Sequence, residues 1–271
     1  MFEWIKDRKR RLIQVISAVL YNCNIGGFAE GRIYQGASKG MCVPGLNCYS
    51  CPGAIGSCPL GSVQFALVSA KYKFPYYIIG ILLLFGILLG RVICGFLCPF
   101  GLIQELLYKI PTKKVKKGKW SEKLSLLKYV ILVVFVVIIP LTMSAPGFCK
   151  YICPAGTLEA GVPLVSSNQR LKSLTGFLFN WKIGVMITIL VMAVFVFRGF
   201  CRFLCPLGAF YGLFNKISVF GFVIDKNKCT GCNACTITCK LDVKKVGDME
   251  CVQCGECINK CKENAIKFKR K

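Results

Sequence analysis

The stretch Arg91-Val-Ile-Cys-Gly-Phe-Leu-Cys-Pro-Phe-Gly101 returns later in the chain as Arg198-Gly-Phe-Cys-Arg-Phe-Leu-Cys-Pro-Leu-Gly208. In both copies two cysteines stand four residues apart, so in a helix their thiols lie on one face, and the proline then disrupts the next turn. An arginine stands just before each cysteine pair. The duplication predicts a helical chain in which two related helix ends offer four thiolates to one site.

A shorter element, Cys-Pro-x-Gly, occurs four times. It begins at Cys58, Cys98, Cys153 and Cys205. In three of the four elements another cysteine stands four residues earlier, at Cys94, Cys149 and Cys201. The first element is looser, because its preceding cysteine is Cys51. The order of the elements predicts two parallel repeats, each running helix, outer element, helix, inner element.

The chain around these elements is too apolar for an ordinary soluble protein, since 55% of its residues are hydrophobic. Its uncharged stretches, each near the length that crosses a bilayer core of roughly 30 Å, are 12–29, 74–90, 129–149 and 183–197. We expect an α-helical membrane protein with four transmembrane helices. The first repeat is 1–110, with an outer cysteine-rich loop at 30–73, and the second repeat is 124–217. A signal peptide is the alternative for the first stretch, but no small-residue cleavage site is evident around Tyr21.

Basic residues predict how the helices are oriented. The segments 6–11 and 109–123 are rich in lysine and arginine, which cytoplasmic loops accumulate. Both segments are therefore expected in the cytoplasm, with 30–73 and 150–177 outside and the C-terminal region inside again. This predicts a multi-pass protein of the cytoplasmic (inner) membrane, in contact with the lipid bilayer. The net charge of +24 is explained by this retention and by anionic lipid, so no nucleic-acid partner is expected.

The Cys-Pro elements predict two further metal sites. The inner site is expected to use Cys94, Cys98, Cys201 and Cys205, with Arg91 and Arg198 offsetting its negative charge. For the outer site, symmetry favours Cys51, Cys58, Cys149 and Cys153. Proximity within the loop instead favours Cys42, Cys48, Cys51 and Cys58. Two alternatives to metal binding stay open, because cysteine also buries well as a small apolar residue and outward-facing pairs form disulfides in oxidising compartments.

The end of the chain carries the spacing C-x2-C-x2-C-x3-C twice, a cysteine ladder at 229–239 and 251–261. In two-cluster ferredoxins three cysteines of one run and the fourth of the other hold each cubane. One [4Fe–4S] cluster is therefore assigned to Cys229, Cys232, Cys235 and Cys261. The second is assigned to Cys239, Cys251, Cys254 and Cys257. Zinc knuckles are the alternative, although zinc does not need two identical four-cysteine runs. We expect 222–271 to form a small two-cluster α+β domain.

Cys-x3-Cys-Pro motifs at helix ends, followed by a two-cluster tail, resemble the membrane-bound polyferredoxins. This family includes the membrane iron–sulfur subunit of periplasmic nitrate reductase systems and the iron–sulfur regulator of nitrous-oxide reductase. The resemblance runs from about residue 75 to the C-terminus. It implies electron passage between the quinol pool or a cytoplasmic donor and a partner across or outside the membrane, with quinone as a further cofactor. The cysteine-dense loop 41–53 departs from the family pattern and suggests an extra outer relay.

We therefore expect a membrane-bound iron–sulfur protein that relays electrons, with two ladder clusters and one or two more in the membrane part. The expected partners are an acidic ferredoxin or flavoprotein on the cytoplasmic side and a membrane or extracytoplasmic reductase. The chain would be an electron-transfer component of an oxidoreductase complex, because no catalytic nucleophile, base or substrate pocket is evident. A copper-reducing or cofactor-assembly factor is the main alternative, since soft thiolates suit copper. A redox sensor is a third class, although no output domain is evident.

Overall fold

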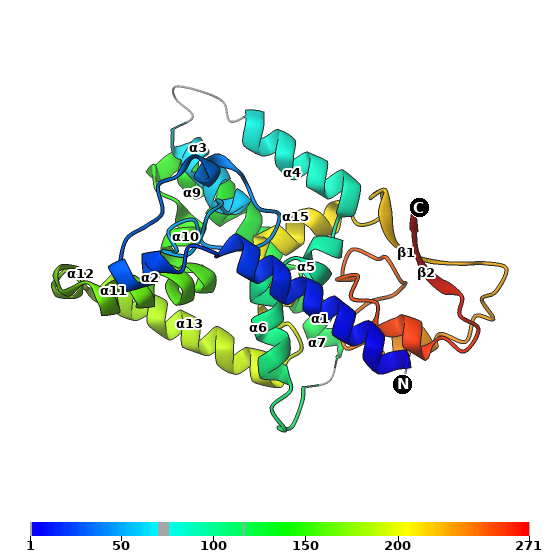
Figure 1. The fold of residues 1–271 in the computed structure, drawn as a ribbon. Coiled ribbons are helices and arrows are strands. Elements are labelled where there is room, and N and C mark those ends of the chain that lie inside the picture. The colour runs from blue at the N-terminus through cyan, green and yellow to red at the C-terminus, as the bar shows by residue number, and fades with distance from the viewer. Residues whose placement is uncertain (1, 70–75, 116, 271) are drawn as a thin grey trace.

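The computed structural model describes residues 2–69, 76–115 and 117–270. These residues form a helical body and one two-stranded sheet, and both chain ends lie at the end of the molecule that carries the sheet (Figure 1). The helical fold predicted from the sequence is confirmed, and the strands appear only beside the cysteine ladder.

The first helix, α1 (Phe2–Tyr21), packs with its polar side inward. Its buried polar side chains are Arg10, Gln14 and Ser17. From residue 12 onward its exposed side chains are apolar: Leu12, Ile13, Val15, Ile16, Val19 and Leu20. A soluble helix would show the opposite pattern, whereas a helix in lipid turns its polar residues toward the protein interior. The packing therefore explains why the apolar run of the sequence belongs to a helix that is not buried.

The stretch 12–29, expected as one span, is divided in the structure. The amide of Asn22 donates to Ala18 O at 3.0 Å and to Asn47 Oδ1 at 2.8 Å, and the backbone N–H of Asn24 donates to Gly53 O at 3.1 Å. The bond to Ala18 O shows the Asn22 side chain competing for a backbone group of the helix, which favours an end of the helix there. The bonds to Asn47 and Gly53 join this end of α1 to the outer loop. A short helix, α2 (Gly26–Glu30), follows.

Two helices in the described part of the chain are long and apolar enough to cross a membrane. One is the continuous helical stretch Trp120–Met143, and the other is α13 (Phe177–Phe195). The first stretch comprises α7 (Lys119–Leu124), α8 (Leu127–Ile131), the π-helical η2 (Leu132–Ile138) and α9 (Ile139–Met143). The wider π-helical turns of η2 come just before Pro140. In a regular α-helix the proline ring would clash with the carbonyl group four residues earlier. The expected spans 129–149 and 183–197 thus correspond to helices that begin earlier along the chain.

A shorter apolar helix, α4 (Tyr76–Leu89), covers most of the expected span 74–90. Residues 74 and 75 of that span, and 70–73 of the outer loop, lie outside the described residues. The four-helix crossing therefore remains a prediction.

Three of the four Cys-Pro elements are breaks between two helical segments, and at the looser element a helix only follows. The helices that precede the breaks are α5 (Val92–Phe96), α10 (Gly147–Tyr151) and α14 (Gly199–Phe203). The segments that follow them are α6 (Pro99–Tyr108), the π-helical η3 (Gly156–Gly161) and α15 (Pro206–Phe214), and α3 (Pro59–Val68) follows the looser element. The cysteine before each proline is extended where it caps α3, α6 and α15, because the proline ring excludes a helical residue before it.

The C-terminal region forms a small unit around the ladder. Strand β1 (Phe220–Ile224) pairs antiparallel with β2 (Ile266–Arg270), with Phe222 opposite Phe268. Between the strands lie only two short helical segments, α16 (Ala234–Ile237) and η4 (Glu256–Lys260). The remaining helices, η1 (Ala37–Gly40), α11 (Val162–Ser167) and α12 (Gln169–Ser173), lie in the two segments expected outside.

The main core is built around the Cys-Pro elements. Phe100, Phe148 and Phe200, which come from three different elements, are completely buried. The rings of Phe100 and Phe200 meet edge to face, with centroids 5.1 Å apart. The cysteines of the elements belong to the same cluster of buried residues, so the fold places them at its centre.

Candidate metal centres

Four thiols come together where the two inner elements meet. Cys94 lies on α5 and Cys201 on α14, while Cys98 and Cys205 cap the helices that follow. All four residues are between 5% and 8% exposed. Burial, together with the neighbouring Cys201 and Cys94 thiols, raises the pKa of Cys98 to about 12. Burial and the other three thiols also raise the pKa of Cys205. The structure thus brings together all four residues predicted for the inner site.

The two arginines that precede the inner cysteine pairs cross over. Arg198 Nη1 donates to Cys94 O at 2.5 Å, and Arg91 Nη2 donates to Cys201 O at 3.4 Å. Each arginine therefore binds the backbone of the other repeat's first inner cysteine. Both arginines are completely buried, so their positive charge is kept next to the thiols in a poorly solvated region.

Each buried arginine has an acidic partner. Glu105 accepts from Arg198 Nε at 2.8 Å and from Arg10 Nη1 at 2.8 Å. Glu250 lies 3.6 Å from Arg91 Nη1 and forms an ion pair with Lys128. These carboxylates reduce the cost of burying the guanidinium groups, which would be large for unpaired charges. Four cationic side chains, Arg10, Arg91, Lys128 and Arg198, thus share these two carboxylates.

A cavity of about 240 Å³ gathers four cysteines at the outer elements. Its lining includes Cys48, Cys58, Cys149 and Cys153. Gly156 lies between two of the thiols, because a Cβ added there would be 3.6 Å from Cys153 Sγ and 3.7 Å from Cys48 Sγ. The backbone N–H of Gly156 also points to Cys153 Sγ, at 3.3 Å. This cavity combines members of the two outer sets left open by the sequence.

The other outer cysteines are not among the residues that line this cavity. Cys51 is buried but does not line the cavity. Cys42 Sγ contacts Ser62 Oγ at 3.8 Å, and Cys23 is exposed. Of these two neighbouring cysteines, Cys48 lines the cavity and Cys51 does not, and the ligand set of the outer site remains a prediction. The sequence alone does not distinguish Cys48 from Cys51, because they are only three residues apart in the loop.

The ladder divides into a partly buried and an exposed part. A cavity of about 170 Å³ is lined by Cys235, Cys239, Cys251, Cys254 and Cys257. It includes all four residues predicted for the second ladder cluster. Burial and the neighbouring thiols raise the pKa of Cys257 to about 12. Of the first predicted set, Cys229 and Cys232 are exposed, and Cys261 Sγ accepts from the Ala265 N–H at 3.3 Å.

The ladder packs directly on the inner site. A Cβ added to Gly95, which follows Cys94, would be 2.6 Å from Val252 O and 3.0 Å from Gln253 O. Val252 and Gln253 lie between two ladder cysteines, Cys251 and Cys254. Only a glycine permits this approach of two backbones.

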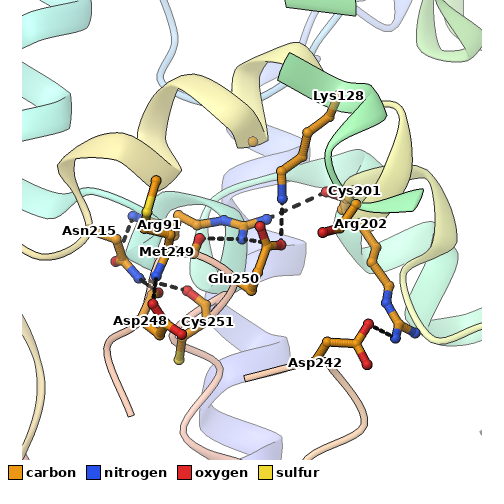
Figure 2. A network of polar contacts seen from close by, with 12 residues as sticks. Arg91, Lys128, Cys201, Arg202, Asn215, Asp242, Asp248, Met249, Glu250 and Cys251 are labelled. Atoms are coloured by element: carbon orange, nitrogen blue, oxygen red, sulfur yellow. Dashed lines mark hydrogen bonds and ion pairs between the residues drawn. The ribbon is translucent and has the colours of Figure 1, made fainter. Parts of the chain in front are cut away.

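A polar network holds this contact in place. Figure 2 shows Arg91 reaching Met249 O, at 2.7 Å, and Glu250, while Asn215 donates to Asp248 O at 2.5 Å and to Cys251 O at 3.0 Å. These partners are consecutive residues of the segment that leads into the second ladder run. Asn215 belongs to the turn after α15. The network therefore binds the ladder to both inner elements.

A buried part of the outer loop connects the inner and outer sites. A Cβ added to Gly45 would be 3.1 Å from Cys98 Cα, and the backbone of Leu46 hydrogen-bonds to the Cys98 thiol. The backbone of Asn47 hydrogen-bonds to the Cys58 thiol. The next residue along the chain, Cys48, lines the outer cavity. The segment 44–47 thus contacts cysteines of both sites.

The donor sets fit iron–sulfur clusters. The inner and outer sites each offer four thiols, the ligand number of a [4Fe–4S] cluster, and the ladder cavity offers at least as many. Backbone N–H groups of Gly156 and Gly208 point at Cys153 Sγ and Cys205 Sγ. Among residues 2–69, 76–115 and 117–270, no three cysteine or acidic side chains are close enough to hold a single metal ion. A cubane binds one thiolate on each of its four irons and therefore needs a wider arrangement than a single zinc ion.

Comparison with known proteins agrees with this chemistry. The family model described as a 4Fe-4S binding domain matches three segments, 74–118, 127–171 and 178–224, which together make up half of the chain. The chain belongs to this 4Fe-4S binding family. Each matched segment contains one apolar helix and one Cys-x3-Cys-Pro element. No solved structure matches the protein.

Three relatives illustrate the family. Uncharacterized protein MJ0750 of Methanocaldococcus jannaschii is 32% identical over 69% of this chain and 76% of its own. Ferredoxin-type protein NapH of Haemophilus influenzae is 27% identical over 69% of this chain and 65% of its own. Regulatory protein NosR of Pseudomonas aeruginosa is 26% identical over 64% of this chain and 24% of its own. The resemblance to membrane-bound polyferredoxins is confirmed, and the protein belongs among iron–sulfur electron-transport proteins.

A polar residue also accompanies each Cys-Pro element, and the cysteine motifs alone do not identify it. Six positions after the Cys-Pro cysteine stand Gln64, Gln104, Glu159 and Tyr211. Glu159 accepts from the Cys48 N–H at 2.7 Å, and Tyr211 donates to Pro44 O at 3.0 Å. Burial raises the pKa of Glu159 to about 7. The constant offset within a predominantly apolar helix is the signal that identifies these residues.

Proposed function

We propose that the protein is a membrane-bound relay that carries electrons between the ladder and the outer site. In this proposal Cys94, Cys98, Cys201 and Cys205 hold an inner [4Fe–4S] cluster. Cys48, Cys58, Cys149 and Cys153 hold an outer one. The ladder holds two more, with the ligand sets predicted from the sequence. Such clusters take up and release single electrons, and the protein sets their potentials through charge, hydrogen bonds and exposure.

The carrying observation is the unbroken series of contacts between the sites. Gly95 joins the inner site to the ladder segment at Val252, and Gly45 joins the inner site to the outer loop. The segment 44–47 then leads to Cys48 in the outer cavity. These contacts support electron passage within one polypeptide, without a quinone between the inner and outer sites.

The exposed apolar side chains support a position across the membrane. Those of α1 lie on one face, and the two long apolar helices, Trp120–Met143 and α13, keep most of their surface exposed. In the proposed arrangement 1–110 and 124–217 are parallel repeats of two crossings each. The N-terminus and the domain 222–271 are cytoplasmic, which agrees with their position at the same end of the molecule (Figure 1).

The exposed part of the ladder suits an acidic electron donor or acceptor. Cys229 and Cys232 are exposed. The exposed lysines of the same domain are Lys226, Lys228, Lys240, Lys244, Lys245, Lys260, Lys262, Lys267 and Lys269. We propose an acidic ferredoxin or flavoprotein as the cytoplasmic partner, since opposite charges speed association. A membrane or extracytoplasmic reductase would exchange electrons at the outer site.

Metal analysis of anaerobically purified protein tests this proposal. Four clusters predict about sixteen irons and as many acid-labile sulfides per chain, whereas the ladder alone predicts about eight. Replacing Cys94 and Cys201 by serine should remove about four irons, and the same change at Cys58 and Cys149 should remove another four. Eight irons in the wild-type protein, or copper bound at the outer cysteines, would refute the relay.

A further inference from the structure

The Cys-Pro elements at Cys58 and Cys153 form an outer pair, and those at Cys98 and Cys205 form an inner pair. Gln64 and Gln104 follow the first element of the outer pair and of the inner pair, respectively. Each stands six residues after the cysteine that begins its Cys-Pro-x-Gly element, and each side chain is completely buried. Each also donates to a carbonyl of its own helix, Gln64 to Leu60 O at 3.2 Å and Gln104 to Phe100 O at 3.4 Å. The two amides therefore share the same local anchor.

At the inner site, Gln104 binds across to the other repeat. Its Nε2 donates to Cys201 Sγ at 3.1 Å, and its Oε1 accepts from the Phe200 N–H at 3.0 Å. The bond from the Phe200 N–H to Oε1 fixes the orientation of the Gln104 amide, and its NH2 group then faces the Cys201 thiol. Glutamine is suited to this place since one side chain supplies both an acceptor and donors.

At the outer site, Gln64 repeats this arrangement. Its Nε2 donates to Cys149 Sγ at 3.2 Å, and its Oε1 accepts from the Phe148 N–H at 2.9 Å. Cys149 and Cys201 are corresponding cysteines, each the first of a Cys-x3-Cys-Pro element. The other two residues at this offset, Glu159 and Tyr211, instead bind the backbone of the outer loop. Only the first element of each pair sends an amide to a thiol.

An amide that donates to a cysteine sulfur affects the oxidation states of a cluster unequally. A reduced cluster carries one more negative charge than the oxidised one, and a hydrogen bond to the ligand stabilises the more negative form. Hydrogen bonds to the sulfurs are an established means by which proteins set cluster potentials. A buried donor is most effective, because water does not compete for the sulfur.

We infer that Gln64 and Gln104 are matched positioning residues, which hold the Cys149 and Cys201 thiolates and raise the reduction potentials of the outer and inner sites respectively. This inference rests on the proposed clusters at these two sites. Because the two amides make the same contacts, they shift both potentials in the same direction. The buried arginines then distinguish the inner site, since they lie at Cys94 and Cys201.

Potentiometric titration followed by electron paramagnetic resonance tests the inference in full-length protein. The variant Gln104→Met keeps a similar volume but lacks the donor. It should lower the inner potential by about 59 mV, which is a tenfold fall in the equilibrium constant for one-electron reduction. The outer potential should not change. Gln64→Met should have the reverse effect, so each variant is the control for the other.

A second variant separates tuning from folding. Gln104→Glu keeps an acceptor for the Phe200 N–H but replaces the amide donor with an acidic group, so it should also lower the inner potential. Unchanged potentials in both Gln104 variants, equal shifts at both sites, or loss of inner iron from both variants would overturn the inference. Wild-type protein with only about eight irons would instead refute the proposed clusters themselves.

Discussion

The contact of Gly95 with the ladder gives the most specific structural prediction. In Gly95→Ala the added Cβ would lie 2.6 Å from Val252 O and 3.0 Å from Gln253 O. Both opposing atoms are backbone carbonyls, so no side-chain rotation relieves the clash. The two segments must separate by about 0.8 Å, the difference between 2.6 Å and the 3.4 Å of ordinary van der Waals contact. Such overpacking costs about 1–3 kcal/mol.

The expected consequence is a weaker attachment of the ladder to the inner site. Limited proteolysis between β1 and β2 should become faster in Gly95→Ala, and electron transfer from the ladder to the inner site should become slower. Total iron should stay at the wild-type value, because no ligand is changed. Rapid-freeze electron paramagnetic resonance after mixing with a reductant measures the rate directly.

A matched control is available at Gly184, which lies within α13 and has no atom within 4 Å of an added Cβ. Gly184→Ala should leave the electron-transfer rate unchanged and stabilise the helix by up to about 1 kcal/mol. If Gly95→Ala showed the stability and the rate of this control, the contact between the ladder and the inner site would not exist as described.

Three further predictions follow from other parts of the structure. Glu105→Gln should cost about 3–5 kcal/mol in chemical denaturation, since Arg10 and Arg198 lose a buried anion, whereas Glu122→Gln on the surface should cause no measurable change. Cys48→Ser should remove the irons of the outer site, while Cys51→Ser should retain them by metal analysis. The rate of reduction by an acidic ferredoxin should fall as salt rises from 0.05 to about 0.5 M, because screening weakens the attraction of the exposed lysines; a rate independent of salt would exclude electrostatic docking there.

Local spacing predicted the pieces of the candidate sites but not how each cysteine pair is placed. The i, i+4 cysteines do not share one helical face, because Cys94 and Cys201 lie within short helices while Cys98 and Cys205 are extended residues that cap the next helices. Each proline does begin a new helical segment, and this is why the first helix ends before the second cysteine. The complete inner set, Cys94, Cys98, Cys201 and Cys205, followed from the duplication alone. The four residues of the second ladder set line one cavity, but Cys235 of the first set lines it too, so the division of the ladder between two clusters remains a prediction.

Choices that depend on the folded loop could not be predicted. Cys48 and Cys51 are three residues apart, and only the path of the buried segment 44–47 directs Cys48 to the outer cavity. The contact between Gly95 and Val252 joins residues 157 positions apart, so no local pattern reports it. The sequence analysis also did not predict that α1 turns a polar face inward, because the apolar residues of 12–29 led to its interpretation as a membrane span.

The central claim is that electrons cross the membrane within this chain, and sealed vesicles test it most directly. Protein would be inserted into quinone-free lipid vesicles that contain trapped ferricyanide, and a membrane-impermeant reductant would be added outside. We predict bleaching of the trapped dye with wild-type protein, and none with a variant in which Cys94 and Cys201 are serine. Equal bleaching with both proteins, or none with wild-type protein that contains about sixteen irons, would contradict the account.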